Sequence, residues 1–374
     1  MTSVFQVLWL SLLGAVHCQF INHLWRIGWS SDLEKVVAIR STDILTSSDG
    51  GLSWTDVTPA SGSSPVGADD VAMSSDGSKA VAVVWNGHIW SSSDGGTSWT
   101  EDVSLGVQEW RGVAMSSSGS EMAAVGDNTG IWLTSNGGTT WSQAQTAAST
   151  GMLTSVAISS DGSKIAAVGD GGVWTSVDSG ASWTEQTTLG AGLSWTSVAM
   201  SSDGSKIAAV ANAIWVSSDG GTSWVEDTSV GSTKNWKAVA MSSDGSKMAA
   251  IVGGSAGSPW TSSDGGITWQ EVPYSQSWQD VGVSSDGSKW KAGHTKDNSL
   301  LPGTFATTTT TAATTSGAVG SSVGAETGLD SVTLAIIIST AAVVACLCCV
   351  GIVVLRRRSQ AGDDVQQAVV RAAV

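Results

Sequence analysis

The chain has 374 residues, among them 45 Gly and 20 Trp but only 1 Tyr and 3 Phe. Charged residues make up 13% of the chain and the formal net charge is −15, which argues against nucleic-acid binding through clustered Lys and Arg. The hydrophobic fraction of 41% excludes a chain that is disordered throughout. The excess of Trp over the other aromatic residues indicates one short motif copied many times.

Residues 1–18 are predicted to form a secretory signal peptide. An apolar run from Val4 to Val16 ends in Val16-His17-Cys18, which has small or compact residues at the cleavage-recognition spacing. The run is too short to span a bilayer. Because it lacks a positively charged start, an uncleaved anchor and a buried first strand are the alternatives.

Residues 19–303 form the predicted folded domain, in which two motifs alternate. The inner motif reads Trp-x-x-Val-Ala-Met-Ser-Ser-Asp-Gly-Ser-Lys-x-Ala-Ala-Val, and its Asp position falls at Asp32, Asp76, Ser118, Asp161, Asp203, Asp244 and Asp286. The outer motif reads Trp-x-Ser-Ser-Asp-Gly-Gly-x-Ser-Trp-Thr, and its Asp position falls at Asp49, Asp94, Asn136, Asp178, Asp219 and Asp264.

Each motif predicts a β-hairpin, because Asp-Gly between apolar runs supplies the positive φ that a hairpin turn needs. In the fifth repeat the predicted strands cover Ser197 to Met200, Lys206 to Val210, Ala213 to Ser217 and Ser223 to Glu226. The inner motif recurs in steps of 41 to 44 residues. Two hairpins in such a period are typical of a four-stranded β-propeller blade.

The outer motif resembles the Asp-box, or BNR, repeat of sialidases, sortilin-type receptors, xyloglucanases and the photosystem II assembly-factor propellers of the thylakoid lumen. The resemblance covers about Trp25 to Trp290 and implies an all-β fold, an Asp-box β-propeller, without implying one activity. In that family the Asp holds the turn and a Trp packs beneath it. The resemblance therefore implies structural roles for all six residues at the Asp position and for Trp54, Trp99, Trp141, Trp183, Trp224 and Trp269. No metal or cofactor is expected, because each box offers only one carboxylate.

The number of blades follows from the number of motifs. Seven inner hairpins favour seven blades, the last of them incomplete because only six outer motifs occur. Six blades with an extra hairpin is the alternative. The missing outer strands of a seventh blade could come from Gln19 to Leu24 or from Asn298 to Phe305.

The C-terminal part predicts a membrane anchor. Residues 304–331 are rich in Thr, Ser and Gly and are expected to form a disordered stalk. Residues 332–355 carry no charge and are long enough to cross a bilayer. Arg356 to Arg358 begin a tail, residues 356–374, that is expected to stay in the cytoplasm. The prediction is a single-pass type I protein of the plasma membrane or an endomembrane, with an extracellular or luminal propeller.

A ligand is expected on the rim that carries the variable loops between blades. Four repeats begin their first strand on that rim with a tryptophan: Trp110, Trp195, Trp236 and Trp278. These residues are candidates for an aromatic collar that stacks on a glycan or on apolar groups of a protein. The alternative is that they cap the packing between blades. The acidic pair Asp69 and Asp70 lies at the same level and is expected to belong to a solvated loop.

An enzyme is not expected. A sialidase needs three converging arginines and a Tyr nucleophile with a Glu partner, whereas this domain has only Arg26, Arg40 and Arg111, and its single Tyr is Tyr274, close in sequence to Glu271. The expected function is receptor-like or adhesion-like binding of a protein or glycan, without a nucleic-acid partner. A lumenal scaffold like the photosystem II assembly factors and a degenerate sialidase-like glycosidase are the alternatives.

Overall fold

The computed structural model describes residues 26–60, 64–144, 151–170, 172–189, 192–231, 234–294 and 300–305. The predicted signal peptide, residues 306–331 of the stalk, the membrane span and the tail lie outside the described residues. Within these ranges, no helix has the length and the apolar character that crossing a membrane requires.

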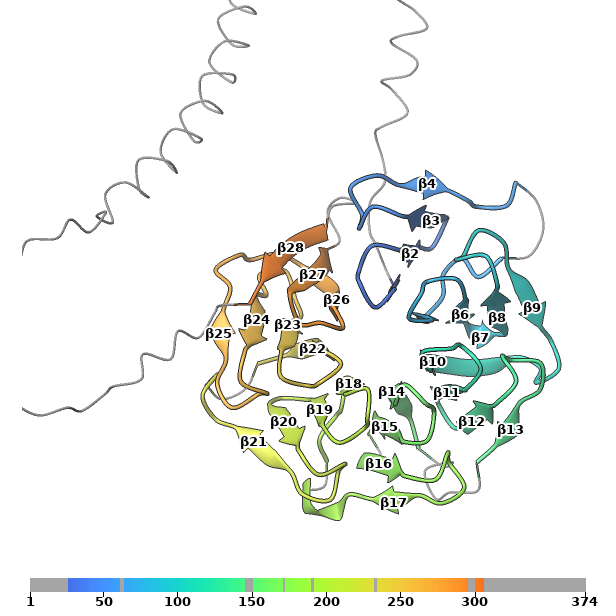
Figure 1. Cartoon of the computed structure of the whole chain (residues 1–374). Coiled ribbons are helices and arrows are strands. Elements are labelled where there is room, and N and C mark those ends of the chain that lie inside the picture. The colour runs from blue at the N-terminus through green and yellow to red at the C-terminus, as the bar shows by residue number, and fades with distance from the viewer. Residues whose placement is uncertain are drawn as a thin grey trace, which may run out of the picture. The chain divides into compact units, whose positions relative to one another are not determined.

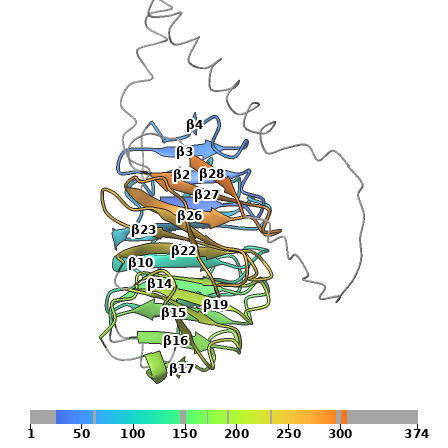
Figure 2. The same ribbon diagram turned by 90° about the vertical axis from the view of Figure 1, so that its left-hand side faces the viewer.

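The described residues form a ring of seven antiparallel sheets around a central channel (Figures 1 and 2). Blade 1 contains β1 (Arg26–Trp29), β2 (Val36–Ile39), β3 (Ile44–Ser47) and β4 (Thr55–Asp56); blade 2 contains β5 (Asp70–Met73), β6 (Ala80–Val83), β8 (Ile89–Ser92) and β9 (Thr100–Asp102). Blade 3 contains β10 (Gln108–Met115), β11 (Met122–Gly126), β12 (Gly130–Thr134) and β13 (Ser142–Gln143), and it is extended by β7 (Trp85–Gly87) from blade 2.

The remaining blades follow the same order from the channel outward. Blade 4 contains β14 (Leu153–Ile158), β15 (Ile165–Gly169), β16 (Gly172–Ser176) and β17 (Thr184–Glu185), and a short 3-10 helix, η2 (Thr187–Leu189), follows it. Blade 5 contains β18 (Ser197–Met200), β19 (Ile207–Val210), β20 (Ile214–Ser217) and β21 (Val225–Asp227); blade 6 contains β22 (Trp236–Met241), β23 (Met248–Val252), β24 (Pro259–Ser262) and β25 (Gln270–Glu271). Blade 7 contains β26 (Trp278–Val283), β27 (Lys289–His294) and β28 (Leu300–Thr304).

The seven-blade prediction is confirmed and the six-blade alternative is wrong. A closed circle of backbone hydrogen bonds joins one serine of every inner turn to the next, with N···O distances of 2.7 to 3.1 Å. The circle runs through Ser31, Ser75, Ser117, Ser160, Ser202, Ser243 and Ser285, whose amide donates back to Ser31. The third strand of blade 7 comes from Leu300–Thr304, inside one of the two segments proposed from the sequence.

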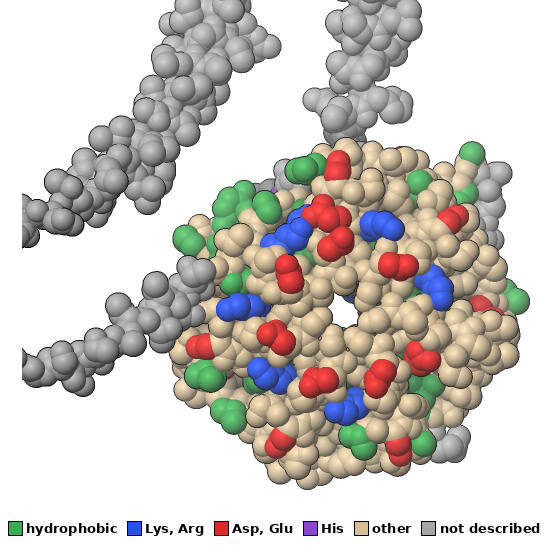
Figure 3. All heavy atoms as spheres, in the orientation of Figure 1, with side chains coloured by type: hydrophobic (Ala, Val, Ile, Leu, Met, Phe, Trp, Pro, Cys, Tyr) green, Lys and Arg blue, Asp and Glu red, His purple; other side chains and the backbone are tan. Residues whose placement is uncertain are grey.

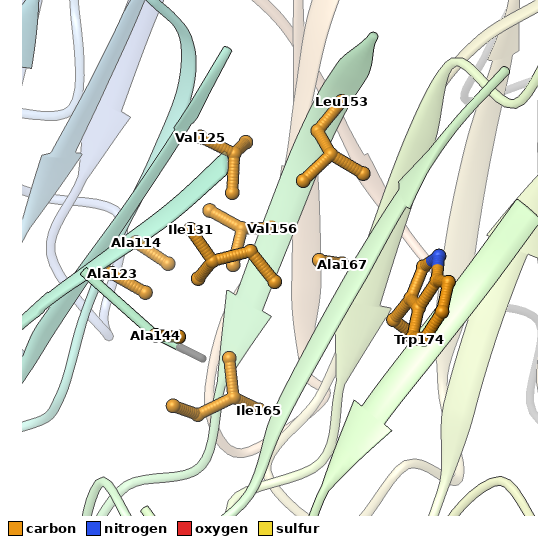
Figure 4. Packing of buried hydrophobic residues seen from close by; sticks show 10 residues of the cluster. All are labelled: Ala114, Ala123, Val125, Ile131, Ala144, Leu153, Val156, Ile165, Ala167 and Trp174. Atoms are coloured by element: carbon orange, nitrogen blue, oxygen red, sulfur yellow. The ribbon is translucent and has the colours of Figure 1, made fainter. Parts of the chain in front are cut away.

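The core consists of layers between adjacent blades, because both faces of each sheet are covered. Between blades 3 and 4, Ala114 and Ala123 lie opposite Val156 and Ile165 (Figure 4). Small side chains on one sheet and larger ones on its neighbour let the two backbones approach closely. The alternation of Ala and Val in the inner motif therefore determines how closely adjacent blades pack in the ring.

The seam between blade 7 and blade 1 is joined by charged side chains in addition to the backbone circle. The ammonium group of Lys289 pairs with the carboxylate of Glu34. The buried ammonium group of Lys291 donates to the carbonyls of Leu33 and Gly50. The first and last blades are therefore tied together by lysines of β27.

Candidate functional site

The four tryptophans of the predicted collar do not face the channel. Trp110, Trp195, Trp236 and Trp278 are only 0 to 1% exposed. Trp195 contacts Trp215 edge-on, with ring centroids 6.4 Å apart, and Trp236 contacts Trp260 in the same way at 6.1 Å. The expectation of a ligand-stacking collar is therefore corrected: these rings fill the space between blades.

In four blades a β-bulge separates the collar position, which is Leu153 in blade 4, from the residue that reaches the channel. The register against the second strand shifts directly after the collar position in β10, β14, β22 and β26. The residues left without a partner across the strand are Arg111, Thr154, Lys237 and Gln279, and all four line one cavity at the channel mouth. A bulge re-aims a side chain in this way, and bulges often occur next to functional sites.

In blades 2, 4, 5 and 7, the next residue along the first strand ties its blade to the following one. A carboxylate oxygen of Asp70 accepts the amide of Val113 at 2.9 Å, and one of Asp280 accepts the amide of Ile27 at 3.3 Å. The hydroxyls of Ser155 and Ser197 accept the corresponding amides of blades 5 and 6, both at 3.3 Å. In these four blades the channel wall at this level therefore contains side-chain acceptors.

The cavity at this opening of the channel measures about 290 Å³. We call it the charged mouth, and it is defined by six charged residues that line it: Arg26, Arg111, Lys237, Asp69, Asp70 and Asp280. Thr154, Ser155, Thr196 and Ser197 are among the uncharged residues of its lining. The guanidinium of Arg111 lies 3.8 Å from the ring centroid of Trp85, 3.2 Å from the carboxylate of Asp127 and 3.7 Å from that of Asp69.

Lys237 differs from the two arginines of the charged mouth in its contacts. Arg26 donates its Nε to the carbonyl of Asp69, whereas the ammonium of Lys237 has neither a hydrogen bond nor an ion pair with any residue that the structure describes. Burial lowers the pKa of Lys237, because it disfavours the charged form. Asp280 attracts this ammonium electrostatically but accepts no hydrogen bond from it, so Lys237 is the cation of this cavity most available to an incoming acceptor.

The acidic residues of the charged mouth are perturbed in the opposite sense. Burial raises the pKa of Asp70 to about 6. Burial, with repulsion from Asp70 as the second cause, raises the pKa of Asp280 to about 7. Burial also raises the pKa of Asp69, whose carboxylate accepts the amide of Trp85 at 2.9 Å. The prediction that Asp69 and Asp70 belong to a solvated loop is therefore wrong, because both line the channel.

The opposite opening of the channel has a different chemistry. A cavity of about 190 Å³ is lined by the seven serines of the backbone circle and by Met73, Met115, Ile158, Met200, Met241 and Val283. Figure 3 shows the face that carries the inner turns, where acidic and basic side chains alternate around the open channel. We call this opening the serine mouth.

The residues at the outer motif occupy turns at the periphery. In blade 2, the carboxylate of Asp94 accepts hydrogen bonds from the Ser98 amide at 2.8 Å, the Ser98 hydroxyl at 2.6 Å and the Ser92 hydroxyl at 2.8 Å. The same contacts with the turn are made by Asp49, Asp178, Asp219 and Asp264. In blade 3, the side-chain amide oxygen of Asn136 accepts a hydrogen bond from the Thr140 backbone amide at 2.9 Å. The indoles of Trp99, Trp183 and Trp224 donate to a glycine carbonyl of the same turn.

The residues considered for a sialidase site are not brought together. Arg40 is buried and pairs with Asp43. Tyr274 is partly exposed and contacts Trp278, and Glu271 is an exposed residue of β25. None of these residues lines the charged mouth, whereas Arg26 and Arg111 do. Among the described residues, no group of three His, Cys, Asp or Glu could hold a metal ion.

The sequence did hold a signal for the charged mouth. The two positions written x between Trp and Val in the inner motif are the ones that face this opening. They vary from Asp69-Asp70 through Thr154-Ser155 to Lys237-Ala238, while the positions around them repeat closely. Variation confined to two adjacent positions of a repeat would have identified this part of the channel wall.

Comparison with known proteins shows the fold of this chain but not its function. No protein-family description and no curated protein sequence matches this chain. The GH74 xyloglucanase from Xanthomonas campestris is similar with a TM-score of 0.61 and 12% identity, over 75% of this chain and 52% of the xyloglucanase chain. This chain thus spans about half of that enzyme.

Two structures of YCF48 have a similar fold and a more similar length. YCF48 from Cyanidioschyzon merolae gives a TM-score of 0.55 and 19% identity over 75% of this chain and 95% of its own. YCF48 bound to D1 peptide gives a TM-score of 0.58 and 16% identity, over 76% of this chain and 93% of its own. The β-propeller fold is thereby shown, and it is shared by an enzyme and by a protein that binds a peptide.

Proposed function

We propose that this protein is a non-enzymatic binding protein whose charged mouth holds an extended segment of a protein ligand. The observation that carries the proposal is the Lys237 ammonium, half-buried in a cavity and without a hydrogen bond or an ion pair among the described residues. A half-buried cation without a hydrogen bond is costly for the free protein, and a ligand oxygen would offset that cost.

A second cavity adjoins the charged mouth and lengthens the proposed site. It measures about 470 Å³, shares Thr196 with the first cavity, and is lined by Leu193, Asn212, Lys234 and Asn235 among others. The ammonium of Lys234 lies 4.9 Å from the ring centroid of Trp260. Asn side chains both donate and accept hydrogen bonds, so they suit the backbone of an extended peptide. The similar fold of YCF48 bound to D1 peptide supports a peptide ligand.

The proposal includes the type I topology expected from the sequence, with the propeller extracellular or luminal and residues 332–355 in the membrane. Protease protection of epitope tags placed before residue 26 and after residue 374 tests this arrangement. A scaffold in the thylakoid lumen is the alternative, supported by the similarity to YCF48. Import of a tagged protein into plastids would favour that alternative.

Glycoside hydrolysis is the other alternative. Asp70 and Asp280, two carboxyls with raised pKa, face one cavity, and a glycosidase needs a carboxylic acid that keeps its proton near neutral pH. Each of these carboxylates, however, accepts two backbone amides, which gives both a structural role. Release of reducing sugar from xyloglucan, or of sialic acid from a sialoside, would replace the binding proposal with this one.

The direct test is a binding screen of the purified protein against peptide arrays and glycan arrays. The proposal expects saturable binding to peptides that carry acidic or amide side chains. Binding confined to glycans would assign the charged mouth to a sugar ligand.

A further inference from the structure

Blade 7 differs from the other blades at its outer edge. Blades 1 to 6 each have a short fourth strand that pairs with the third, from β4 in blade 1 to β25 in blade 6. Among the residues that the structure describes, blade 7 ends with β28, which pairs only with β27. Pro302 in the middle of β28 is typical of an edge strand, because proline cannot donate to a ladder. An edge strand presents unpaired backbone groups that can pair with another chain.

The blades on either side of this edge carry an apolar residue at the tip of their outer turn. Leu52 of blade 1 is 89% exposed and Ile267 of blade 6 is 75% exposed. The same position of the outer motif is Thr97, Thr139, Ala181 or Thr222 in the four blades that do not adjoin blade 7. Large apolar side chains therefore occur at this position only in the two blades that flank the open edge. Exposed apolar side chains placed in this way indicate an interaction surface.

The spacing of the repeat argues against the chain's own N-terminal segment as the covering strand. In the six complete blades, between 5 and 13 residues separate the fourth strand from the first strand of the next blade. Because β1 begins at Arg26, a fourth strand for blade 7 would have to end between residues 12 and 20. Most of that window lies in the predicted signal peptide, residues 1–18. Cleavage after Cys18 would remove nearly all of it.

The existing fourth strands indicate which chemistry fits the edge. Each follows a tryptophan, and the second residue after that tryptophan is acidic in five of six blades: Asp56, Glu101, Glu185, Glu226 and Glu271. Where the indole hydrogen bond is present, it goes to a glycine carbonyl of the same turn, as from Trp224 to Gly221 at 3.0 Å. A strand that completes blade 7 would gain most from the same pattern.

We propose that the outer edge of blade 7 is a docking site for an extended segment of a partner protein, which adds a fourth strand beside β28. The segment carries an aromatic residue followed two positions later by Asp or Glu, and its apolar side chains contact Leu52 and Ile267. The backbone of β28 provides the pairing, while the flanking residues select the sequence. This site is separate from the charged mouth, and neither depends on the other.

The test uses the full-length processed protein in detergent and a fluorescent peptide that copies residues 221–228 of this chain. The expected result is saturable binding, with slower amide exchange over residues 300–304 when the peptide is bound. A peptide with Ala at the tryptophan position is expected to bind about tenfold more weakly. The exposed variants Leu52→Ser and Ile267→Ser are expected to weaken binding of the original peptide, while Thr139→Ser leaves it unchanged.

Two results would overturn the proposal. One is the absence of binding by the original peptide. The other is slow amide exchange over residues 300–304 in the free protein, which would mean that a segment of this chain already covers the edge. Mass spectrometry of the intact protein establishes whether residues 1–18 have been removed, so each result applies to a known N-terminus.

Discussion

The ammonium group of Lys291, in the last blade, lies 2.9 Å from the backbone carbonyl oxygen of Leu33, in the first blade. It also donates to the carbonyl of Gly50 at 2.8 Å, and the side chain is buried. In the other blades the equivalent position of the second strand is Val or Ala, as at Val37 and Ala208. Lys291 therefore replaces a packing residue with a cation that links the two ends of the ring.

Replacement of Lys291 by Ala is expected to lower the free energy of unfolding by about 2 to 4 kcal/mol, because two charge-assisted hydrogen bonds are lost at a buried position. Urea denaturation followed by tryptophan fluorescence measures the change. Lys206→Ala serves as the control, because Lys206 makes one longer hydrogen bond, 3.3 Å, to the carbonyl of Gly245 in the neighbouring blade, away from the seam. Equal losses for both variants would show that the seam has no special dependence on Lys291.

Replacement of Trp195 by Ala is expected to lower the free energy of unfolding by about 3 to 5 kcal/mol, because a fully buried ring leaves a cavity between blades. The matched control is Trp85→Ala, which removes a partly exposed ring beside Arg111 and is expected to cost less than about 1 kcal/mol. A small loss for Trp195→Ala would restore the earlier interpretation of a collar that faces a ligand.

The carboxylate of Asp94 is expected to stabilise its turn through three hydrogen bonds, so Asp94→Ala should lower the free energy of unfolding by about 1 to 2 kcal/mol. Asp94→Asn should cost much less, because Asn136 makes equivalent contacts in blade 3. Thermal denaturation of both variants checks the prediction. It fails if the Asn variant is as unstable as the Ala variant.

The pH dependence of stability should reveal the two carboxyls of the charged mouth. Their pKa values rise on folding from 3.8 to about 6 for Asp70 and about 7 for Asp280, so the folded state binds more protons than the unfolded state between pH 4 and 7. Their contribution is fully present below pH 4 and is lost as the pH rises through 6 and 7. The loss of stability between pH 4 and 7 should be smaller in the double variant Asp70→Asn, Asp280→Asn. An unchanged profile would mean that these carboxyls titrate normally.

The turn carboxylates act in the opposite direction. Hydrogen bonds from the Ser205 amide, the Ser201 hydroxyl and the Ser205 hydroxyl, in this order, lower the pKa of Asp203 to about 2, and the pKa of Asp161 is lowered similarly by its own turn. The unfolded state then binds more protons, so stability is lost as the pH falls from about 4 towards 2. Acid denaturation of Asp203→Asn, compared with the wild type, isolates the contribution of one turn. A parallel shift at all pH values would contradict the prediction.

The repeats made most of the fold predictable from the sequence. In blade 5 the predicted and observed strands agree within two residues at every end, because Asp-Gly turns and alternating apolar residues mark each hairpin. Blade 7 was harder to predict, since Leu300–Thr304 follows no outer motif and its place in the sheet depends on tertiary pairing.

The candidate site was predicted only in part. The sequence indicated the rim on which the charged mouth lies, but it directed attention to tryptophans such as Trp236 instead of the next residue along the strand, Lys237. The difference depends on a β-bulge, which changes side-chain direction without changing composition. Trp85 was also missed as part of the site, because its strand β7 joins blade 3 through pairing with β10.

Binding of the wild type and of Lys237→Ala to the same peptide array, with Lys164→Ala as the control, decides whether the charged mouth holds the ligand. Lys164 belongs to the inner turns on the serine-mouth face, where its ammonium donates to the carbonyl of Asp203 at 2.7 Å. We expect Lys237→Ala to lose the peptides bound by the wild type, while Lys164→Ala retains them and both variants keep the wild-type melting temperature. Retention of the same peptides by Lys237→Ala would contradict binding at the charged mouth.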